Sequence, residues 1–97
     1  MKQLAYHPAA NDEIDAAYIW YAVRSAQAAD GFFEELFLTV KRVHRQPGLF
    51  PGYFHGTRRA VLDHYPYSVV FRELPRKIQI IAVAHAKRRP NYWVNRL

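Results

Sequence analysis

The 97-residue sequence contains no cysteine. This absence excludes a disulfide framework, thiol catalysis and a zinc site with cysteine ligands, and it fits a reducing compartment. Long apolar runs are also lacking, because none approaches the roughly 20 residues that a membrane-spanning helix needs. The start of the chain, from Met1 to His7, has no apolar segment typical of a signal peptide. We therefore expect a cytoplasmic protein with no membrane contact.

Several catalytic patterns are missing as well. In residues 41–97 the only carboxylates are Asp63 and Glu73, so chemistry that needs paired carboxylates is not expected. No glycine-rich phosphate loop follows a predicted strand, and no serine occupies a nucleophile elbow. A metal-free ribonuclease stays open, since cleavage by the 2′-hydroxyl of RNA needs only positioned acids, bases and cations.

Metal and cofactor binding are not predicted. No two histidines have the i, i+4 spacing of a helical metal site, and none lies in a compact cluster with carboxylates. The histidines are His7, His44, His55, His64 and His85. His85 alone directly follows a predicted central strand, where a site would be built. It is either a functional group or a structural histidine bonded to a neighbouring loop.

The net charge of +6 is unevenly distributed. Residues 1–40 carry two basic and six acidic side chains, a net charge of −4, whereas residues 41–97 carry twelve basic and two acidic side chains, a net charge of +10. A basic half attracts polyanions or an acidic protein partner in a salt-dependent way. It is equally consistent with a solvated surface kept basic for solubility.

Hydrophobic periodicity predicts two helices. Apolar residues recur at three- and four-residue steps from about Pro8 to Val23 and again from about Ala26 to Arg45. The link between these segments is so short that the helices should form an antiparallel hairpin. Gly31 is expected to let the two helices approach closely. Ile19 and Trp20 lie off the apolar stripe and are expected to pack on another element or to form a contact surface.

β-Branched and aromatic residues predict the strands. A short strand precedes the first helix, another spans Arg58 to Leu62, and two apolar runs, 67–71 and 78–84, form a hairpin at the centre of the sheet. The order β-αα-βββ predicts one α+β domain over residues 1–97. In it the helical hairpin packs on a small, mostly antiparallel sheet, and a short helical turn closes the C-terminus.

Strict alternation along the run 78–84 places its apolar side chains on both faces of the sheet. Ile80 and Ala82 then share one face, whereas Ile81 and Val83 take the other. Both faces are therefore expected to be at least partly covered, as in a central strand. Pro90 is expected to open the final helical turn, which would contain Trp93.

The sharpest local signal is the segment 85–96 that follows this strand. It combines cations with aromatic rings, namely Lys87, Arg88, Arg89, Tyr92 and Trp93. Such a set suits a nucleic-acid surface, because the cations contact phosphates and the rings stack on bases. It also suits a protein interface. In a third interpretation the two rings fold back over the sheet to complete the core while the cations are solvated.

Five segments form an ordered set along nearly the whole chain. They are His7–Ala10 before a tyrosine-rich helix, Phe32-Phe33, Arg58-Arg59, Pro66–Arg72, and Ile80–Trp93 with its ending His-x-x-Arg-Arg-Pro-x-Tyr-Trp. This set resembles the RelE/ParE superfamily of type II toxins. The resemblance implies a small bacterial toxin that inhibits growth and is neutralised by a cognate antitoxin. It also implies that the toxin–antitoxin complex regulates its own transcription.

Some members of this superfamily cleave mRNA on the ribosome, and others inhibit DNA gyrase. The sequence departs from the ribonuclease pattern, because Ser68 stands where that branch typically has arginine, and Arg58 and Arg59 stand where it uses lysines. Arginine does not exchange protons at neutral pH. The resemblance therefore favours a ParE-like poison of a DNA topoisomerase. Its implied target-binding residues are Arg58, Arg59, Lys87, Arg88, Arg89, Tyr92 and Trp93.

The alternative is a RelE-like, ribosome-dependent endoribonuclease that works without a metal. The residues that would bind and cleave RNA are Arg58, Lys87, Arg88 and Tyr92, with His85 as acid or base. A third interpretation, a nucleic-acid-binding module that is not a toxin, lacks a recognised docking motif.

Overall fold

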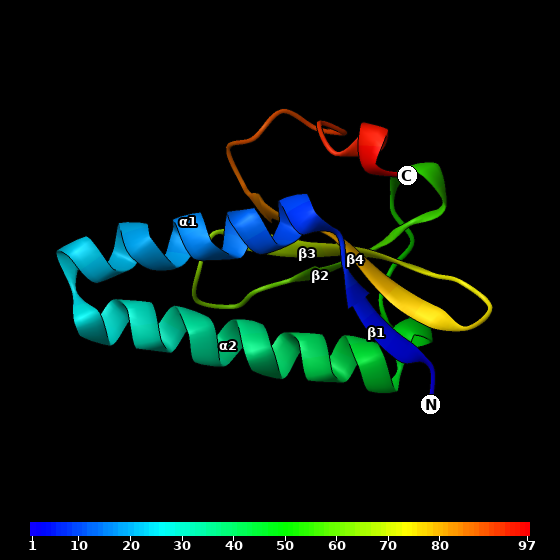
Figure 1. Ribbon diagram of the computed structural model, residues 1–97, viewed down its shortest axis with the longest axis horizontal. Helices are drawn as coiled ribbons and strands as arrows, with labels where there is room; N and C mark the ends of the chain where they lie inside the picture. Colours follow the sequence, from blue (N-terminus) through cyan, green and yellow to red (C-terminus); the bar gives the residue numbers. More distant parts are fainter.

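Two helices and four strands follow one another in the predicted order (Figure 1). The computed structural model describes residues 1–97, with the elements β1 Gln3–Tyr6, α1 Pro8–Arg24, α2 Ala26–Arg45, β2 Arg58–Val61, β3 Tyr67–Glu73 and β4 Lys77–His85. The predicted α+β architecture is therefore confirmed. Neither helix is long and apolar enough to cross a membrane.

The central strand of the sheet is β4. The strand order is β1-β4-β3-β2, in which β1 runs parallel to β4 and the other neighbours are antiparallel. The helices lie side by side on one face of the sheet (Figure 1). Phe32 and Leu36 of α2 pack there with Phe71 and Ile80 in the main core. A strand with neighbours at both edges and cover on both faces has to be largely apolar, as β4 is.

A β-bulge in β4 changes which side chains face the helices. Phe71 pairs with Ile80 and Val70 pairs with Ala82, which leaves Ile81 as the extra residue. Val83 therefore joins Ile80 in the main core, whereas Ile81 and Ala82 lie together in a second, smaller core. The expectation of strict alternation holds for Ile81 and is wrong beyond it, because the extra residue reverses the faces of Ala82 and Val83.

Local chemistry sets the ends of the helical hairpin. His7 caps α1, with its Nδ1 accepting a hydrogen bond from the Ala9 N–H at 3.0 Å, and Pro8 fits the first helical position. Ser25 lies between the helices in an extended conformation, and its Oγ accepts a hydrogen bond from the Ala28 N–H at 3.2 Å. One serine therefore separates α1 from α2, which matches the predicted antiparallel hairpin.

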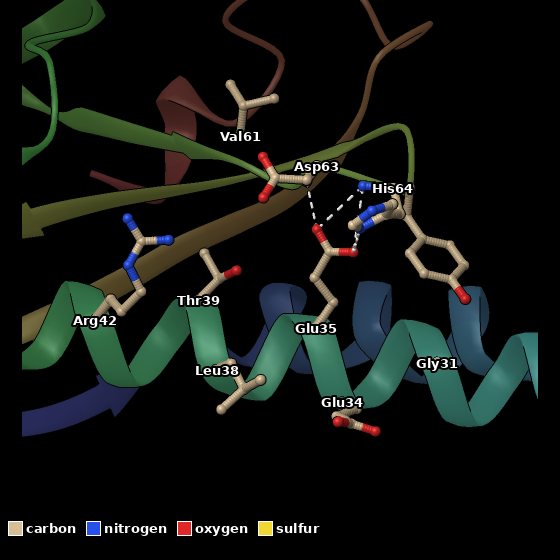
Figure 2. A pocket seen from close by; sticks show the side chains of 10 residues that line it. Gly31, Glu34, Glu35, Leu38, Thr39, Arg42, Val61, Asp63 and His64 are labelled. Carbon is tan, nitrogen blue, oxygen red and sulfur yellow. Dashed lines mark hydrogen bonds and ion pairs between the residues drawn. The ribbon is translucent and has the colours of Figure 1, made fainter.

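The loop between β2 and β3 is held down on α2. Glu35 accepts hydrogen bonds from the backbone N–H groups of Asp63 and His64, and the His64 ring lies 3.0 Å from the same carboxylate (Figure 2). Tyr65 donates a hydrogen bond to the Ala28 carbonyl, and a Cβ at Gly31 would collide with its hydroxyl. Gly31 therefore makes room for Tyr65, not for α1 as the sequence suggested.

The C-terminal segment, residues 86–97, covers the face of the sheet that the helices leave open. Trp93 is 1% exposed and packs with Val70, Ile81 and Ala82 in the second core. The final helical turn spans Val94–Arg96. It starts after Trp93, so the expectation that Pro90 opens a turn containing Trp93 is wrong.

Candidate functional site

A cleft of about 520 Å³ lies between α1 and the C-terminal end of β4. We call it the basic-aromatic cleft. Its lining residues on α1 are Glu13, Ala16, Ala17, Trp20 and Tyr21. The β2–β3 loop contributes Pro66, and the sheet and the C-terminal segment contribute Tyr67, Val83, His85, Lys87, Arg88 and Tyr92. Four residues singled out from the sequence, His85, Lys87, Arg88 and Tyr92, are thus brought together.

The cations at this cleft are free of ion pairs. Lys87, Arg88 and the adjacent Arg89 are exposed, and none of them takes part in a salt bridge. The guanidinium carbon of Arg88 lies 3.9 Å from the centroid of the Tyr92 ring, a cation–π contact that orients this side chain. Unpaired cations next to rings give a surface that attracts anionic or acidic groups.

His85 is fixed at the end of β4. Its Nδ1 accepts a hydrogen bond from the Lys87 N–H at 3.0 Å, and its ring meets the Tyr67 ring edge-on at a centroid distance of 5.0 Å. These contacts leave Nε2 as the nitrogen with no protein partner. His85 therefore faces the cleft with one nitrogen that a bound molecule can reach.

Tyr92 is half-buried, and its hydroxyl is already engaged. The hydroxyl donates a hydrogen bond to Oε2 of Glu13 at 2.6 Å. Burial raises the pKa of Tyr92, and the hydrogen bond to Glu13 raises it further. Burial also raises the pKa values of Tyr21 and Tyr67, which line the same cleft. These phenols stay protonated at neutral pH and do not act as bases there.

Arg58 and Arg59 lie outside the cleft, on opposite faces of the sheet. Arg58 pairs in register with Phe71 of the main core and donates a hydrogen bond to the Phe50 carbonyl at 2.6 Å. Arg59 pairs with Val70 on the other face, and its guanidinium carbon lies 4.4 Å from the centroid of the Tyr53 ring. The expectation of a single surface containing both arginines is wrong, because neighbouring strand residues alternate between faces.

Trp93 also differs from its expected place. Its burial in the second core excludes it from the exposed target-binding surface. For this ring the third interpretation, completion of the core, is the correct one. Tyr92 takes an intermediate position, with its ring at the edge of the cleft.

Two other hollowed parts of the surface contain none of the predicted site residues. One, of about 580 Å³, lies between α2 and the β2–β3 loop and is lined by carboxylates such as Glu34 and Asp63 (Figure 2). The other lies between α1 and α2 and consists of two adjoining recesses of about 530 and 250 Å³. We call the latter the hairpin groove, and its lining includes Ile14, Asp15, Tyr18, Ile19, Asp30, Phe33, Glu34 and Phe37.

Reasoning from the sequence missed Glu13 and its partner Arg96, and it left open what Trp20 contacts. Glu13 had only the expected role of an acidic residue near the start of a helix. Trp20 gave a signal, because it lies off the apolar stripe, and it is 51% exposed at the mouth of the cleft. Arg96 forms a salt bridge with Glu13 at 2.9 Å, and nothing in its sequence neighbourhood indicated this contact.

A helical hairpin on a small sheet, with an exposed basic cleft at the end of the central strand, is the arrangement of a RelE/ParE-class toxin. Residues 4–90 match the family described as "ParE toxin of type II toxin-antitoxin system, parDE". The chain therefore belongs to the ParE toxin family.

Individual relatives agree with this assignment. Toxin ParE2 from two strains of Mycobacterium tuberculosis is 28% identical over 92 residues, which cover 93% of this chain and 87% of the relative. A solved structure from the chromosomal ParDE TA system of P. aeruginosa has the same fold, with a TM-score of 0.79 at 24% identity. That match covers 90% of this chain and 98% of the other.

Proposed function

We propose that this ParE-type toxin stops growth by binding and poisoning a DNA topoisomerase of the gyrase type through the basic-aromatic cleft. The observation that carries the proposal is a set of exposed, unpaired cations beside aromatic rings, namely Lys87, Arg88 and Arg89 beside Tyr92 and Trp20. Aromatic and arginine side chains of this kind dominate the binding energy of protein interfaces. Membership of the ParE family supports the same target class.

The ribonuclease alternative has fewer groups to work with. Acid–base cleavage of RNA needs side chains that exchange protons near neutral pH. Burial and the hydrogen bond to Glu13 raise the pKa of Tyr92 and keep it protonated, and Arg58 points to the Phe50 carbonyl on another part of the molecule. His85 alone remains as a group of suitable chemistry in the cleft. Binding to a topoisomerase needs no side chains that exchange protons.

One experiment separates the two activities. The purified chain is added to a gyrase supercoiling assay and, separately, to a translation extract in which mRNA integrity is followed. We expect inhibited supercoiling and intact mRNA, with at least about tenfold weaker inhibition by Arg88→Ala, as for a hot-spot arginine. His85→Ala should change little.

Arg76→Ala is the matched control, because Arg76 is an exposed cation at the opposite end of β4. Cleaved mRNA with normal supercoiling, abolished by His85→Ala, would establish the ribonuclease and reject the proposal.

We also propose where the cognate antitoxin binds. The hairpin groove exposes large apolar side chains, with Ile19 60%, Phe33 51% and Phe37 57% exposed, which is unusual for a free surface. The carboxylates along it, Asp15, Asp30 and Glu34, form no salt bridges. An apolar segment of the antitoxin with flanking lysine or arginine residues complements both features. This partner contact lies on the side of α1 away from the basic-aromatic cleft.

A further inference from the structure

The half of β4 that carries the cleft has a strand on one edge only. β1 ends at Tyr6, which pairs with Ile80, so beyond this point β3 is the only neighbouring strand. Side chains replace the missing strand. The Val83 N–H donates a hydrogen bond to Oε1 of Glu13 at 3.0 Å, and the Ile81 carbonyl accepts one from Arg96 at 3.0 Å. Backbone groups that would otherwise lack partners are thereby satisfied.

One carboxylate joins three parts of the fold at this place. Glu13 of α1 holds β4 through Val83 and holds the C-terminal segment through Tyr92 and Arg96. Its contact with Arg96 is bidentate, at 2.9 and 3.0 Å, and each of the two side chains is only 15% exposed. Bidentate, charge-assisted bonds of this type fix geometry strongly.

The same contacts determine where a cation of the cleft lies. Glu13 fixes the hydroxyl of Tyr92, and the ring of Tyr92 supports the guanidinium of Arg88 at 3.9 Å. Arg96 approaches the same ring at 5.2 Å. No hydrogen bond or salt bridge joins Glu13 to Arg88 directly. The contacts that connect Glu13 to Arg88 therefore run through Tyr92.

We propose that Glu13 is a positioning residue for the basic-aromatic cleft. Glu13 acts through Tyr92 to hold Arg88 in the orientation that contacts the target. The inference rests on the proposed function in one respect, since it takes Arg88 as a target contact. The link from Glu13 to the C-terminal segment does not depend on what the target is.

A double-mutant cycle in the supercoiling assay tests the coupling. Glu13→Gln keeps the size of the side chain, and we expect inhibition about tenfold weaker, as with Arg88→Ala. If the two substitutions disrupt one contact, the double variant should inhibit supercoiling only about 10- to 30-fold less strongly than wild type. Independent effects would multiply to inhibition about 100-fold weaker. Asp12→Asn is the control, because Asp12 is the exposed, unpaired neighbour of Glu13 on α1.

A second measurement does not depend on gyrase. Amide hydrogen exchange by NMR should become at least about tenfold faster at Val83 and over residues 92–96 in Glu13→Gln, and unchanged in Asp12→Asn. Tyr92→Phe, which keeps the ring and the Arg96–Glu13 pair, should speed exchange at position 92 but leave Val83 protected. If the wild-type chain fails to inhibit gyrase, the proposed function fails while the exchange data still decide the role of Glu13. Unchanged exchange in Glu13→Gln, or a fully multiplicative cycle, would overturn the inference.

Discussion

Tyr92 shows how one side chain connects stability with the candidate site. Its ring supports Arg88, and its hydroxyl is bound to Glu13 in a half-buried position. Folding therefore favours the protonated phenol, and the folded protein has a pKa for Tyr92 above that of a free tyrosine. The stabilisation that follows is complete below the unfolded pKa of about 10 and is lost as the pH rises through the folded value.

Comparison of wild type with Tyr92→Phe tests this pH dependence of stability directly. Wild type should exceed the variant in free energy of unfolding by a constant amount up to about pH 9, and the difference should shrink above about pH 10. Urea unfolding at a series of pH values measures both proteins. Because every other titrating group is common to the two, their contributions cancel. A difference that stays constant up to about pH 11 would contradict the role of the hydroxyl.

The sequence predicts the positions of some residues of the candidate site and not of others. Lys87, Arg88 and Tyr92 were predicted because they lie close together after an apolar strand. Glu13 was not, since its hydrogen-bond partners lie 70 to 83 positions away along the chain. Trp93 was misplaced because a tryptophan beside arginines is equally suited to an interface and to a core.

At the level of elements, the helices were predictable and the details of β4 were not. Pro8 and Ser25 mark the helix starts in the sequence, and the structure has helices at Pro8–Arg24 and Ala26–Arg45. β4 is apolar on both faces, so its sequence contains no period-2 pattern that a bulge would visibly interrupt. The reversal of faces at Ile81 therefore became evident only from the register with β3.

Besides the contacts with Glu13, burial of Trp93 should hold the C-terminal segment in place. Trp93→Ala removes the largest side chain of the second core, and we expect a loss of about 3–5 kcal/mol in the free energy of unfolding. Urea denaturation followed by circular dichroism measures the change. Trp20→Ala is the control, because this ring is 51% exposed and its loss should cost no more than about 1 kcal/mol. Equal losses in the two variants would show that Trp93 does not anchor the segment.

On the scale of the whole molecule, α1 lies between two surfaces of different character. Its cleft side faces the unpaired cations of the C-terminal segment, and its groove side is apolar with unpaired carboxylates. The uneven charge of the sequence predicted a basic region, but periodicity did not reveal that the helices leave a groove open. That groove arises from how α1 and α2 pack, and both helices contribute to it.

Antitoxin binding should depend on the hairpin groove and not on the cleft. Phe37→Lys places a cation in the groove, where it would repel the proposed basic flank of the antitoxin and disrupt apolar contact. We expect at least about tenfold weaker antitoxin binding by calorimetry, with growth inhibition retained. Gln27→Lys adds the same charge to an exposed site of α2 outside the groove and should bind normally. Undiminished affinity in Phe37→Lys would place the antitoxin elsewhere.

The position of α1 has a consequence for how such a toxin diversifies. Adjacent residues on this helix belong to different surfaces, with Trp20 in the cleft and Ile19 in the groove. Substitutions on one side leave the chemistry of the other untouched. On our proposal that the groove binds the antitoxin and the cleft binds the target, a lineage can exchange one immunity protein for another while its lethal activity is inherited unchanged. Closely related toxins in one cell would then each be insulated from the antidotes of the others.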